Sequence, residues 1–435
     1  MRFRTLPALR ASARLCCRPV SVKGLASVAI LLIPTIWALV AVAALVTRIP
    51  LSLLTNFWAE DGAFFYSQAY NLGGLHALTI PYAGYLHTIP RLEAGVAVNM
   101  PVVYGPLMAS AVALAFDVLP GAFFLSSRCS HLAPLSVRLI LSTVSVVLPD
   151  TFELNGNLAN IQWHLVLFGL LLLVGQPPRT LFGHCIDILG LLLVGMSGPF
   201  GLLLSPIALG LWWFQGRPRW LLSRLASLVA TAVVQGTVIL IYRNQRPPLN
   251  TRMSWDSVVR VFDRPLLTPL IGGDTYRGWH GQPWWQSEWL PVVVLGVGAA
   301  VIAYGALRGP TPLRALYVVA AGILAMTLAS PGAVTLADLG AGAGGMRYFY
   351  VPAVAWIITL VWLALRADWR WLRVLPILVL GYALLVAVPV DWRYPHLAPT
   401  RFAVVARQFD QAPRGTQMAL PEEPGPPWAV NLIKR

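Results

Sequence analysis

The sequence predicts a polytopic, all-α integral membrane protein, and three observations support that fold class. Apolar residues make up 57% of the 435 residues and charged residues only 11%, a balance that soluble globular domains do not show. Several apolar stretches approach or exceed the ~20 residues that an α-helix needs to cross a bilayer. These stretches are continuous, whereas the strands of an outer-membrane barrel would alternate apolar and polar residues.

The first apolar run, residues 24–46, follows a basic N-terminal segment that contains no acidic residue. A cleaved signal peptide has an apolar core of only ~7–15 residues, so we expect this longer run to persist as an anchoring helix. Its basic flank predicts a cytoplasmic N-terminus. Residues 41–43 resemble a cleavage site, and cleavage there would leave the orientation of the following helices unchanged.

From that start we expect about 11 transmembrane helices, which puts the C-terminus outside. The connections then assigned to the cytoplasm are rich in arginine, as the positive-inside rule requires. The short pieces between 134 and 215 could merge or be re-entrant. The expected helices are 24–46, 94–118, 134–149, 161–175, 181–196, 199–215, 224–242, 289–307, 313–330, 348–365 and 372–390.

We expect a transmembrane domain over residues 1–390 and a short extracytoplasmic tail, 391–435. Two long outside loops, 48–93 and 243–288, interrupt the helices, and the first should carry interfacial helices. Fourteen of the seventeen acidic residues fall outside in this topology, so the polar chemistry is expected there. The net charge of +15 comes from basic residues dispersed between apolar segments, which argues against nucleic acid as a partner. The four cysteines indicate no disulfide framework.

The stretch WAEDG, residues 58–62, places two adjacent acids just beyond the first expected helix. One interpretation is a solvated interfacial loop. The other is a catalytic carboxylate on an amphipathic helix whose aromatic face, residues 64–66, lies on the membrane. A sugar carried on a lipid phosphate would react at this depth, and one carboxylate would suffice as general base, because phosphate is a competent leaving group. We predict Asp61 as that base, with Glu60 in support or as a metal ligand.

Candidate phosphate-binding residues lie in two further motifs. Arg347 and Tyr348 begin a late helix after a glycine-rich approach, and an arginine there could bind a phosphate bidentately. The alternative is an interfacial, snorkelling arginine. His87 and Arg91 could contact the phosphate or the acceptor, although Pro90 between them should limit any helix, and a purely structural role is as good an account.

Polar and aromatic residues crowd the entrance of helix 161–175 and suit recognition of sugar hydroxyls and stacking on a sugar face. Capping of the helix by one of its asparagines is an equally good local account. No cofactor is required, although a divalent cation bound by Glu60, Asp150, Glu153 and Asp274 remains an option that no ligand spacing demands. The predicted sugar- or acceptor-binding residues are Asn157, Asn160, Gln162, Trp163, His164 and, from the first loop, Tyr85.

These features together resemble the membrane glycosyltransferases of the C-type (GT-C) fold, which use polyprenyl-phosphate sugars. The resemblance rests on the first-loop acids and on three motifs, PYAGYLHTIPRLEA at 81–94, NGNLANIQWHL at 155–165 and GGMRYFYVP at 344–352. It is closest to the bacterial arabinofuranosyl-, mannosyl- and pilin glycosyltransferases. Many of these carry a sizeable soluble C-terminal domain, which this chain's tail of about 45 residues does not match.

The resemblance implies a multi-pass protein of the bacterial cytoplasmic membrane with its active site on the extracytoplasmic side. It implies inverting transfer of a sugar, with arabinofuranose as our guess, from a polyprenyl-phosphate donor to a glycan or protein acceptor. The family's catalytic aspartate falls on Asp61.

The alternative function is a multispanning transporter or a flippase for lipid-linked glycans. Such proteins place ionisable groups near the bilayer midplane, often on broken helices in two corresponding halves, and this sequence shows neither. Asp187 is the one acid expected inside the membrane. It could form a proton relay with His184, or it could lie at the cytoplasmic edge. A ligase that moves whole glycans, the third option, would depend on Arg and His more than on a first-loop acid.

Overall fold

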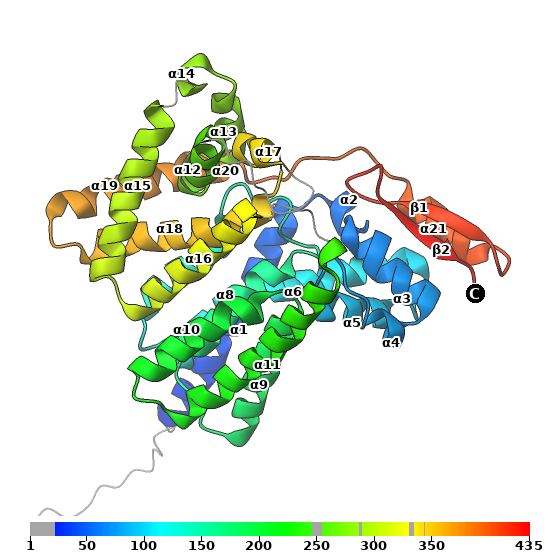
Figure 1. Ribbon diagram of the computed structural model, residues 1–435, viewed down its shortest axis with the longest axis horizontal. Coiled ribbons are helices and arrows are strands. Elements are labelled where there is room, and N and C mark those ends of the chain that lie inside the picture. The colour runs from blue at the N-terminus through cyan, green and yellow to red at the C-terminus, as the bar shows by residue number, and fades with distance from the viewer. Residues whose placement is uncertain (1–21, 246–254, 287–288, 330–334, 343) are drawn as a thin grey trace, which may run out of the picture.

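The computed structural model describes residues 22–245, 255–286, 289–329, 335–342 and 344–435, so the predicted basic N-terminal segment lies outside the described residues. The described chain is mostly helical (Figure 1). It contains six helical segments long and apolar enough to cross a membrane. These are α6 (Gly105–Leu125) with the preceding turn η2 (Val102–Tyr104), α11 (Arg219–Ile241), α15 (Trp289–Arg308), α16 (Thr311–Ala329), α18 (Met346–Arg366), and α19 (Arg370–Tyr382) with η5 (Ala383–Ala387) and α20 (Val388–Val390).

Five shorter apolar helices accompany these six. All eleven expected helices have a counterpart at or near their predicted positions, while the number that cross the membrane stays a prediction. These five are the portion Leu32–Arg48 of α1 (Val22–Arg48), α7 (Leu135–Val147), α8 (Ile161–Val174), α9 (Leu181–Met196) and α10 (Phe200–Phe214).

One expected boundary is wrong. The sequence predicted a helix over 94–118, but the chain forms α5 (Thr88–Ala97), breaks, and begins α6 at Gly105. Pro101 explains the break, because proline lacks an amide donor and disfavours helical geometry in the residue before it. The shift moves Asp117 from the expected cytoplasmic end of a helix into the middle of α6, where it is 2% exposed.

The bundle is built around α8 and α18, whose side chains are buried on nearly every side. A helix that is apolar all round needs neighbours on all its faces. Helix α8 packs against α6, α9 and α10, and α18 packs against α16 and α19. The N-terminal ends of α8 and α18 therefore hold the loops that precede them against a rigid core.

The first loop folds into short helices beside the bundle. They are α2 (Leu51–Leu54), η1 (Asp61–Tyr66), α3 (Ser67–Leu72), α4 (Gly74–Ala77) and then α5. The expectation that aromatic residues 64–66 lie on the membrane is wrong for two of the three. Phe65 and Tyr66 are 1% and 0% exposed, because Phe57, Tyr82 and the neighbouring loop segments cover them.

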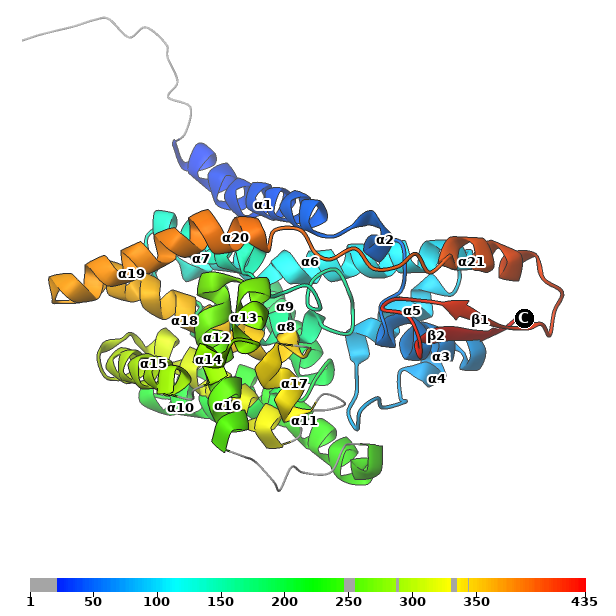
Figure 2. The ribbon, with the colours of Figure 1, turned by 90° about the horizontal axis from the view of Figure 1, so that it is seen from above.

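The C-terminal tail is folded rather than extended, and it adds a small sheet that the all-α prediction missed. Helix α21 (Phe402–Gln411) precedes strand β1 (Gln417–Pro421), which pairs antiparallel with β2 (Ala429–Ile433). Every third or fourth residue of α21 is buried, as in an amphipathic helix. The tail contacts η1, η2 and α3, and both views show it beside the first loop (Figures 1 and 2).

The second long loop forms α12 (Trp255–Ile271), α13 (Gly273–His280) and α14 (Pro283–Gln286), and α17 (Leu336–Ala341) packs against α12. Arg264 of α12 ties three loops together. Its guanidinium donates to the carbonyls of Leu339 and Gly344 at 2.8 and 2.7 Å and pairs with Asp150 at 3.1 Å. The remaining turns are η3 (Ser127–Cys129) and η4 (Arg243–Gln245).

Candidate functional site

A cavity of about 390 Å³ lies where the first loop, the loop before α8, the start of α18 and the tail meet. We call it the aromatic cavity. Its volume is within the ~300–1,000 Å³ typical of small-molecule sites. Its wall contains aromatic, charged and apolar groups. The Trp and Tyr residues that line it are Trp58, Tyr82, Tyr85, Trp163, Tyr348 and Trp428, the charged residues are Glu60, Glu153 and Arg347, and the apolar residues from α10 and α16 include Phe200, Ile323 and Met326.

Eight of the twelve predicted site residues line this cavity, although they come from three distant stretches of the chain. The other four, Asp61, Arg91, Asn157 and His164, are buried behind its wall. The lining residues are Glu60, Tyr85, His87, Asn160, Gln162, Trp163, Arg347 and Tyr348.

Glu60 and Asp61 point to different places. Glu60 lies on the cavity wall, where the Tyr82 hydroxyl donates to its Oε1 at 3.4 Å. The carboxylate of Asp61 turns toward the loop before α8 and accepts the backbone N–H groups of Leu158 at 2.8 Å and Ala159 at 2.7 Å. Successive side chains of one backbone diverge, so only one of the two acids can face the cavity.

Burial controls the charge of Asp61. Removal from water raises its pKa to about 8, and the charge of Glu60 adds to this effect, while the amides of Leu158 and Ala159 oppose it. Asp61 therefore changes protonation in the physiological range, and it does so while it holds the loop that forms part of the cavity wall.

Arg347 reaches the cavity from the first turn of α18. Glu153 holds this turn at two points, because its Oε2 accepts the N–H of Met346 at 3.2 Å and lies 3.6 Å from the Arg347 guanidinium. Gly345 precedes the helix with a φ of 67°, and a Cβ there would collide with Leu339. A guanidinium carries five N–H donors, so the contact with Glu153 leaves capacity to bind an anion.

His87 lines the cavity as a neutral group. Burial lowers its pKa to about 3, and its ring stacks on Tyr85 with centroids 4.4 Å apart. Both ring nitrogens lack a hydrogen-bond partner among the described residues. His87 can donate one hydrogen bond to a phosphate or a hydroxyl, but it brings no positive charge.

The expectation that Pro90 limits a helix is wrong, because Pro90 falls in the first turn of α5, where a missing N–H costs nothing. The helix carries Arg91 behind the wall. Its guanidinium donates to Gln68 Oε1 at 2.9 Å and lies over the Phe65 ring at 5.2 Å. The structure therefore keeps Arg91 one turn from His87, but Arg91 does not line the cavity with the other predicted phosphate ligands.

Two asparagines brace the loop before α8. Asn160 is the N-cap residue, but its amide makes no cap bond to the helix and donates instead to the carbonyl of Glu153 and to Asn157 Oδ1. On the cavity side, Gln162 donates to the Tyr85 hydroxyl at 3.3 Å. Trp163 lies edge-on to Tyr348, and its indole N–H has no partner among the described residues.

His164 belongs to a buried network inside the bundle. Its ring nitrogens lie 3.1 Å from Asn155 Oδ1 and 3.0 Å from the Tyr350 hydroxyl, and Asp117 is 3.4 Å away. Asp117 also accepts the N–H of Gly156 at 2.8 Å. The network fixes the base of the loop, and His164 does not reach the aromatic cavity.

Three of the four acids considered for a divalent cation are paired with arginines, and the fourth, Glu60, accepts from the Tyr82 hydroxyl. Asp150 binds Arg264 and Arg277, Asp274 binds Arg277, and Glu153 binds Arg347. Within the described ranges, no group of three or more His, Cys, Asp or Glu side chains is arranged to bind a metal.

The tail supplies site residues that the sequence interpretation missed. The backbone of Glu423 pairs with that of Phe57 and Ala59, with N–O distances of 3.0 and 2.6 Å, and this brings Pro424 and Trp428 into the cavity wall. Burial and the nearby Asp61 raise the pKa of Glu422 to about 9. The sequence signal that could have identified this part of the site is the motif EEPGPPW, which places a second acid pair near a tryptophan.

Asp187 joins three parts of the bundle through arginines expected at the cytoplasmic side. It forms an ion pair with Arg128 of η3 at 2.6 Å and a second with Arg224 of α11. Both carboxylate oxygens are thus bound by guanidinium groups, an arrangement that serves packing, and a proton relay with His184 stays a prediction.

No protein-family model matches the chain, and no curated protein matches its sequence. The function must therefore be inferred from the chemistry of the site.

Proposed function

We propose that the protein transfers a sugar, with inversion, from a polyprenyl-phosphate donor to an extracytoplasmic acceptor. The observation that carries this proposal is the composition of the aromatic cavity. A carboxylate and a guanidinium, Glu60 and Arg347, lie in the same cavity as apolar residues of α10 and α16. A lipid-linked sugar likewise combines a charged head group with an apolar chain, and aromatic faces suit the sugar itself.

The reaction breaks the bond between the anomeric carbon and the phosphate oxygen, and that oxygen keeps the electron pair. The acceptor oxygen bonds to the anomeric carbon and loses its proton to a carboxylate. Arg347 stabilises the charge that grows on the leaving phosphate, and His87 adds a neutral hydrogen bond. The polyprenyl phosphate then leaves as the second product.

We favour Glu60 over Asp61 as the base. Glu60 lies on the cavity wall, whereas both oxygens of Asp61 accept loop amides behind it. We therefore assign proton transfer to Glu60 and the positioning of the loop before α8 to Asp61. Asp61 stays the alternative base, because a carboxylate can realign when substrate binds.

The test is transfer from a synthetic polyprenyl-phosphate sugar by the purified chain. We expect Glu60→Gln and Arg347→Ala to lower kcat by ~10²–10⁴-fold, the range for loss of a general base or of a charge-stabilising group. Asp61→Asn should retain more activity than Glu60→Gln. The exposed Asp368→Asn serves as the matched control. Wild-type turnover in Glu60→Gln and Arg347→Ala would refute the proposal, and a larger loss in Asp61→Asn would return the base to that residue.

A transporter or flippase remains the second candidate because of one observation, the buried pair of Asp117 and His164 in the bundle. Ionisable groups inside a membrane often mark a transport pathway. Translocation of a fluorescent polyprenyl-phosphate sugar across proteoliposomes, abolished by Asp117→Asn and unaffected by Glu60→Gln, would favour transport over transfer.

A further inference from the structure

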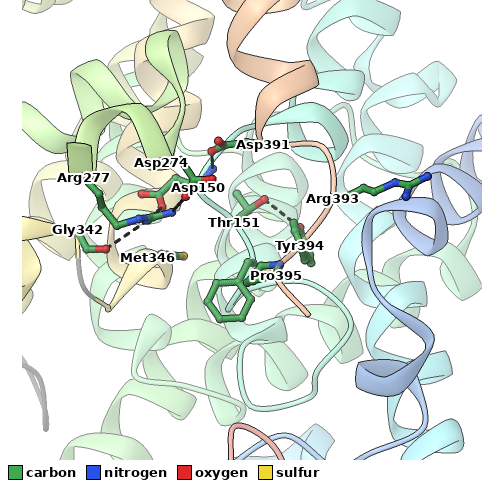
Figure 3. Close-up of a pocket in the computed structure, with 11 residues that line it drawn as sticks. Asp150, Thr151, Asp274, Arg277, Gly342, Met346, Asp391, Arg393, Tyr394 and Pro395 are labelled. Atoms are coloured by element: carbon green, nitrogen blue, oxygen red, sulfur yellow. Dashed lines mark hydrogen bonds and ion pairs between the residues drawn. The ribbon is translucent and has the colours of Figure 1, made fainter. Parts of the chain in front are cut away.

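A second cavity, of about 340 Å³, lies beside the aromatic cavity and has no role in the proposed transfer step. The loop before α8, helix α13, the loop before α18 and the chain after α20 form its walls (Figure 3). We call it the aspartate cavity after Asp150, Asp274 and Asp391, which face it from three of these segments.

Acidic groups outnumber basic groups at this cavity. Arg277 pairs with Asp150 at 3.2 Å and with Asp274 at 2.5 Å, whereas the side chain of Arg393 points away from the three aspartates (Figure 3). Asp391 accepts the N–H groups of Asp150 and Gly273 through Oδ2. Of the two lining arginines, only Arg277 pairs with these carboxylates, and Arg264, outside the lining, also pairs with Asp150. The charges are thus largely compensated, and an anionic ligand would gain little net attraction here.

The same groups suit a neutral ligand rich in hydroxyls. Carboxylate oxygens accept hydrogen bonds from hydroxyls, and Asp391 Oδ1 has no partner among the described residues. The guanidinium of Arg277 can donate. The rings of Phe152 and Tyr394, whose centroids are 6.3 Å apart, add an apolar face. Carboxylates, a guanidinium and aromatic rings in one small cavity are the groups that bind a sugar.

The two cavities are adjacent. Phe152 lines the aspartate cavity and the next residue, Glu153, lines the aromatic cavity. In the same way, Met346 lines the aspartate cavity and Arg347 the aromatic cavity. The rings of Phe152 and Trp58, one from each cavity, meet edge-on with centroids 5.6 Å apart. The two cavities are therefore separated by side chains that are in contact with each other.

We propose that the aspartate cavity binds a carbohydrate, namely the non-reacting part of a glycan acceptor whose terminal hydroxyl enters the aromatic cavity. The assignment as an acceptor rests on the proposed function, whereas carbohydrate binding does not. The proposal selects a glycan over a protein as the acceptor.

Binding is tested first, with the purified full chain and no donor. Saturation-transfer NMR would measure mannotriose, an arabinofuranosyl tetrasaccharide and a serine-containing decapeptide. We expect one of the oligosaccharides to bind, and Asp274→Asn and Phe152→Leu to weaken its binding at least 10-fold. Asp274 is mostly exposed, so its variant should fold, and Asp368→Asn is again the matched control. Binding of the peptide alone, unaltered binding in both variants, or no binding of either sugar would overturn the proposal.

Transfer kinetics then test the acceptor role. The same two variants should raise KM for the bound oligosaccharide while kcat, and KM for a monosaccharide glycoside acceptor, stay unchanged. Oligosaccharide binding without any sugar transfer would refute the proposed function and leave the carbohydrate site standing. Transfer with KM for the oligosaccharide unaltered in both variants would leave the function standing and refute the acceptor site.

Discussion

Gly62 is the residue at which the first-loop motif and the tail come closest. A Cβ at this position would collide with Glu422 Oε2 and would lie 2.6 Å from Val430 Cγ2 and 2.8 Å from Phe57 Cβ. These atoms belong to packed or buried side chains, so they cannot move aside cheaply. The glycine in WAEDG is therefore required by close approach of the tail, a reason that its own neighbours in sequence do not reveal.

We expect Gly62→Ala to cost ~1–3 kcal/mol, the usual range for overpacking, and to loosen the tail. Limited proteolysis within residues 412–435 and the thermal unfolding midpoint in detergent would measure the effect. Gly210→Ala is the matched control, since a Cβ there meets no atom within 4 Å. Equal protease resistance and equal unfolding midpoints for the two variants would contradict the close contact.

Asp61 offers a second prediction at the scale of one residue. Its pKa of about 8 means that the carboxyl is mostly protonated below pH 7, and a protonated oxygen is a poorer acceptor for a loop amide. We expect kcat for sugar transfer at saturating donor to rise with pH through a limb near 8, and Asp61→Asn to remove that limb while it retains turnover within about 10-fold. The pH profile of kcat at saturating donor, which does not depend on donor affinity, checks this for both proteins. A wild-type profile that is flat between pH 7 and 9 would disprove it.

At the scale of elements, the Asp187 cluster fixes one end of the bundle. One carboxylate binds guanidinium groups from η3 and α11, and Arg224 also donates to the carbonyl of Leu172 in α8. Removing the carboxylate would leave two buried or half-buried cations without a counter-charge. Loss of the carboxylate costs more free energy of unfolding than the intact cluster contributes, because the remaining arginines stay desolvated without a counter-charge.

We expect Asp187→Asn to destabilise the protein by ~3–5 kcal/mol, with no direct effect on the aromatic cavity. The thermal unfolding midpoint in detergent would fall, and the folded fraction that remains should bind the donor with wild-type affinity. Cys185→Ser, an exposed change on the same helix, should leave the midpoint unaltered. A midpoint for Asp187→Asn equal to that of Cys185→Ser would show that the cluster is dispensable.

The helices were largely predictable from sequence, because each depends on a continuous apolar run that composition reveals. The prediction of a helix over 94–118 was wrong because it did not take account of the break at Pro101. The β-hairpin was not predicted, for a different reason. Its five-residue strands are too short for a period-two pattern to stand out, and they are ordered by contacts with η1 and α3 some 360 residues earlier, as between Asn71 and Asn431.

The membership of the site was predicted better than the roles within it. Most of the predicted residues meet in one cavity, because the three motifs lie at helix entrances that the bundle brings together. The direction of each side chain was not predictable. Glu60 faces the cavity and Asp61 does not because of a backbone turn at Ala59, where φ is 43°, and because the loop before α8 offers two amides to Asp61.

At the scale of the whole molecule, the contact between the first loop and the tail contains buried carboxyl groups. Asp61 and Glu93 of the first loop and Glu422 of the tail are buried, and the pKa values of all three are raised, to about 8, 8 and 9. Burial is the main cause in each case. Asp61 and Glu422 interact, as do Asp61 and Glu93, so ionisation of one disfavours ionisation of the others.

This cluster makes docking of the tail dependent on pH, and the sign follows from the raised pKa values. In the unfolded chain these carboxyls ionise near pH 4, so the folded state binds more protons between about pH 4 and 9. The stability they contribute is fully present below pH 4 and is lost as pH rises through 8 to 9.

We expect protease resistance of residues 412–435 to decline between pH 6 and 9, and Glu422→Gln, which stays neutral, to flatten the decline. The exposed Asp368→Asn should follow wild type. Because Trp428 forms part of the aromatic cavity, sugar-donor affinity should decline over the same pH interval. A tail that becomes more resistant to protease as pH rises would show that the carboxyls are not buried together.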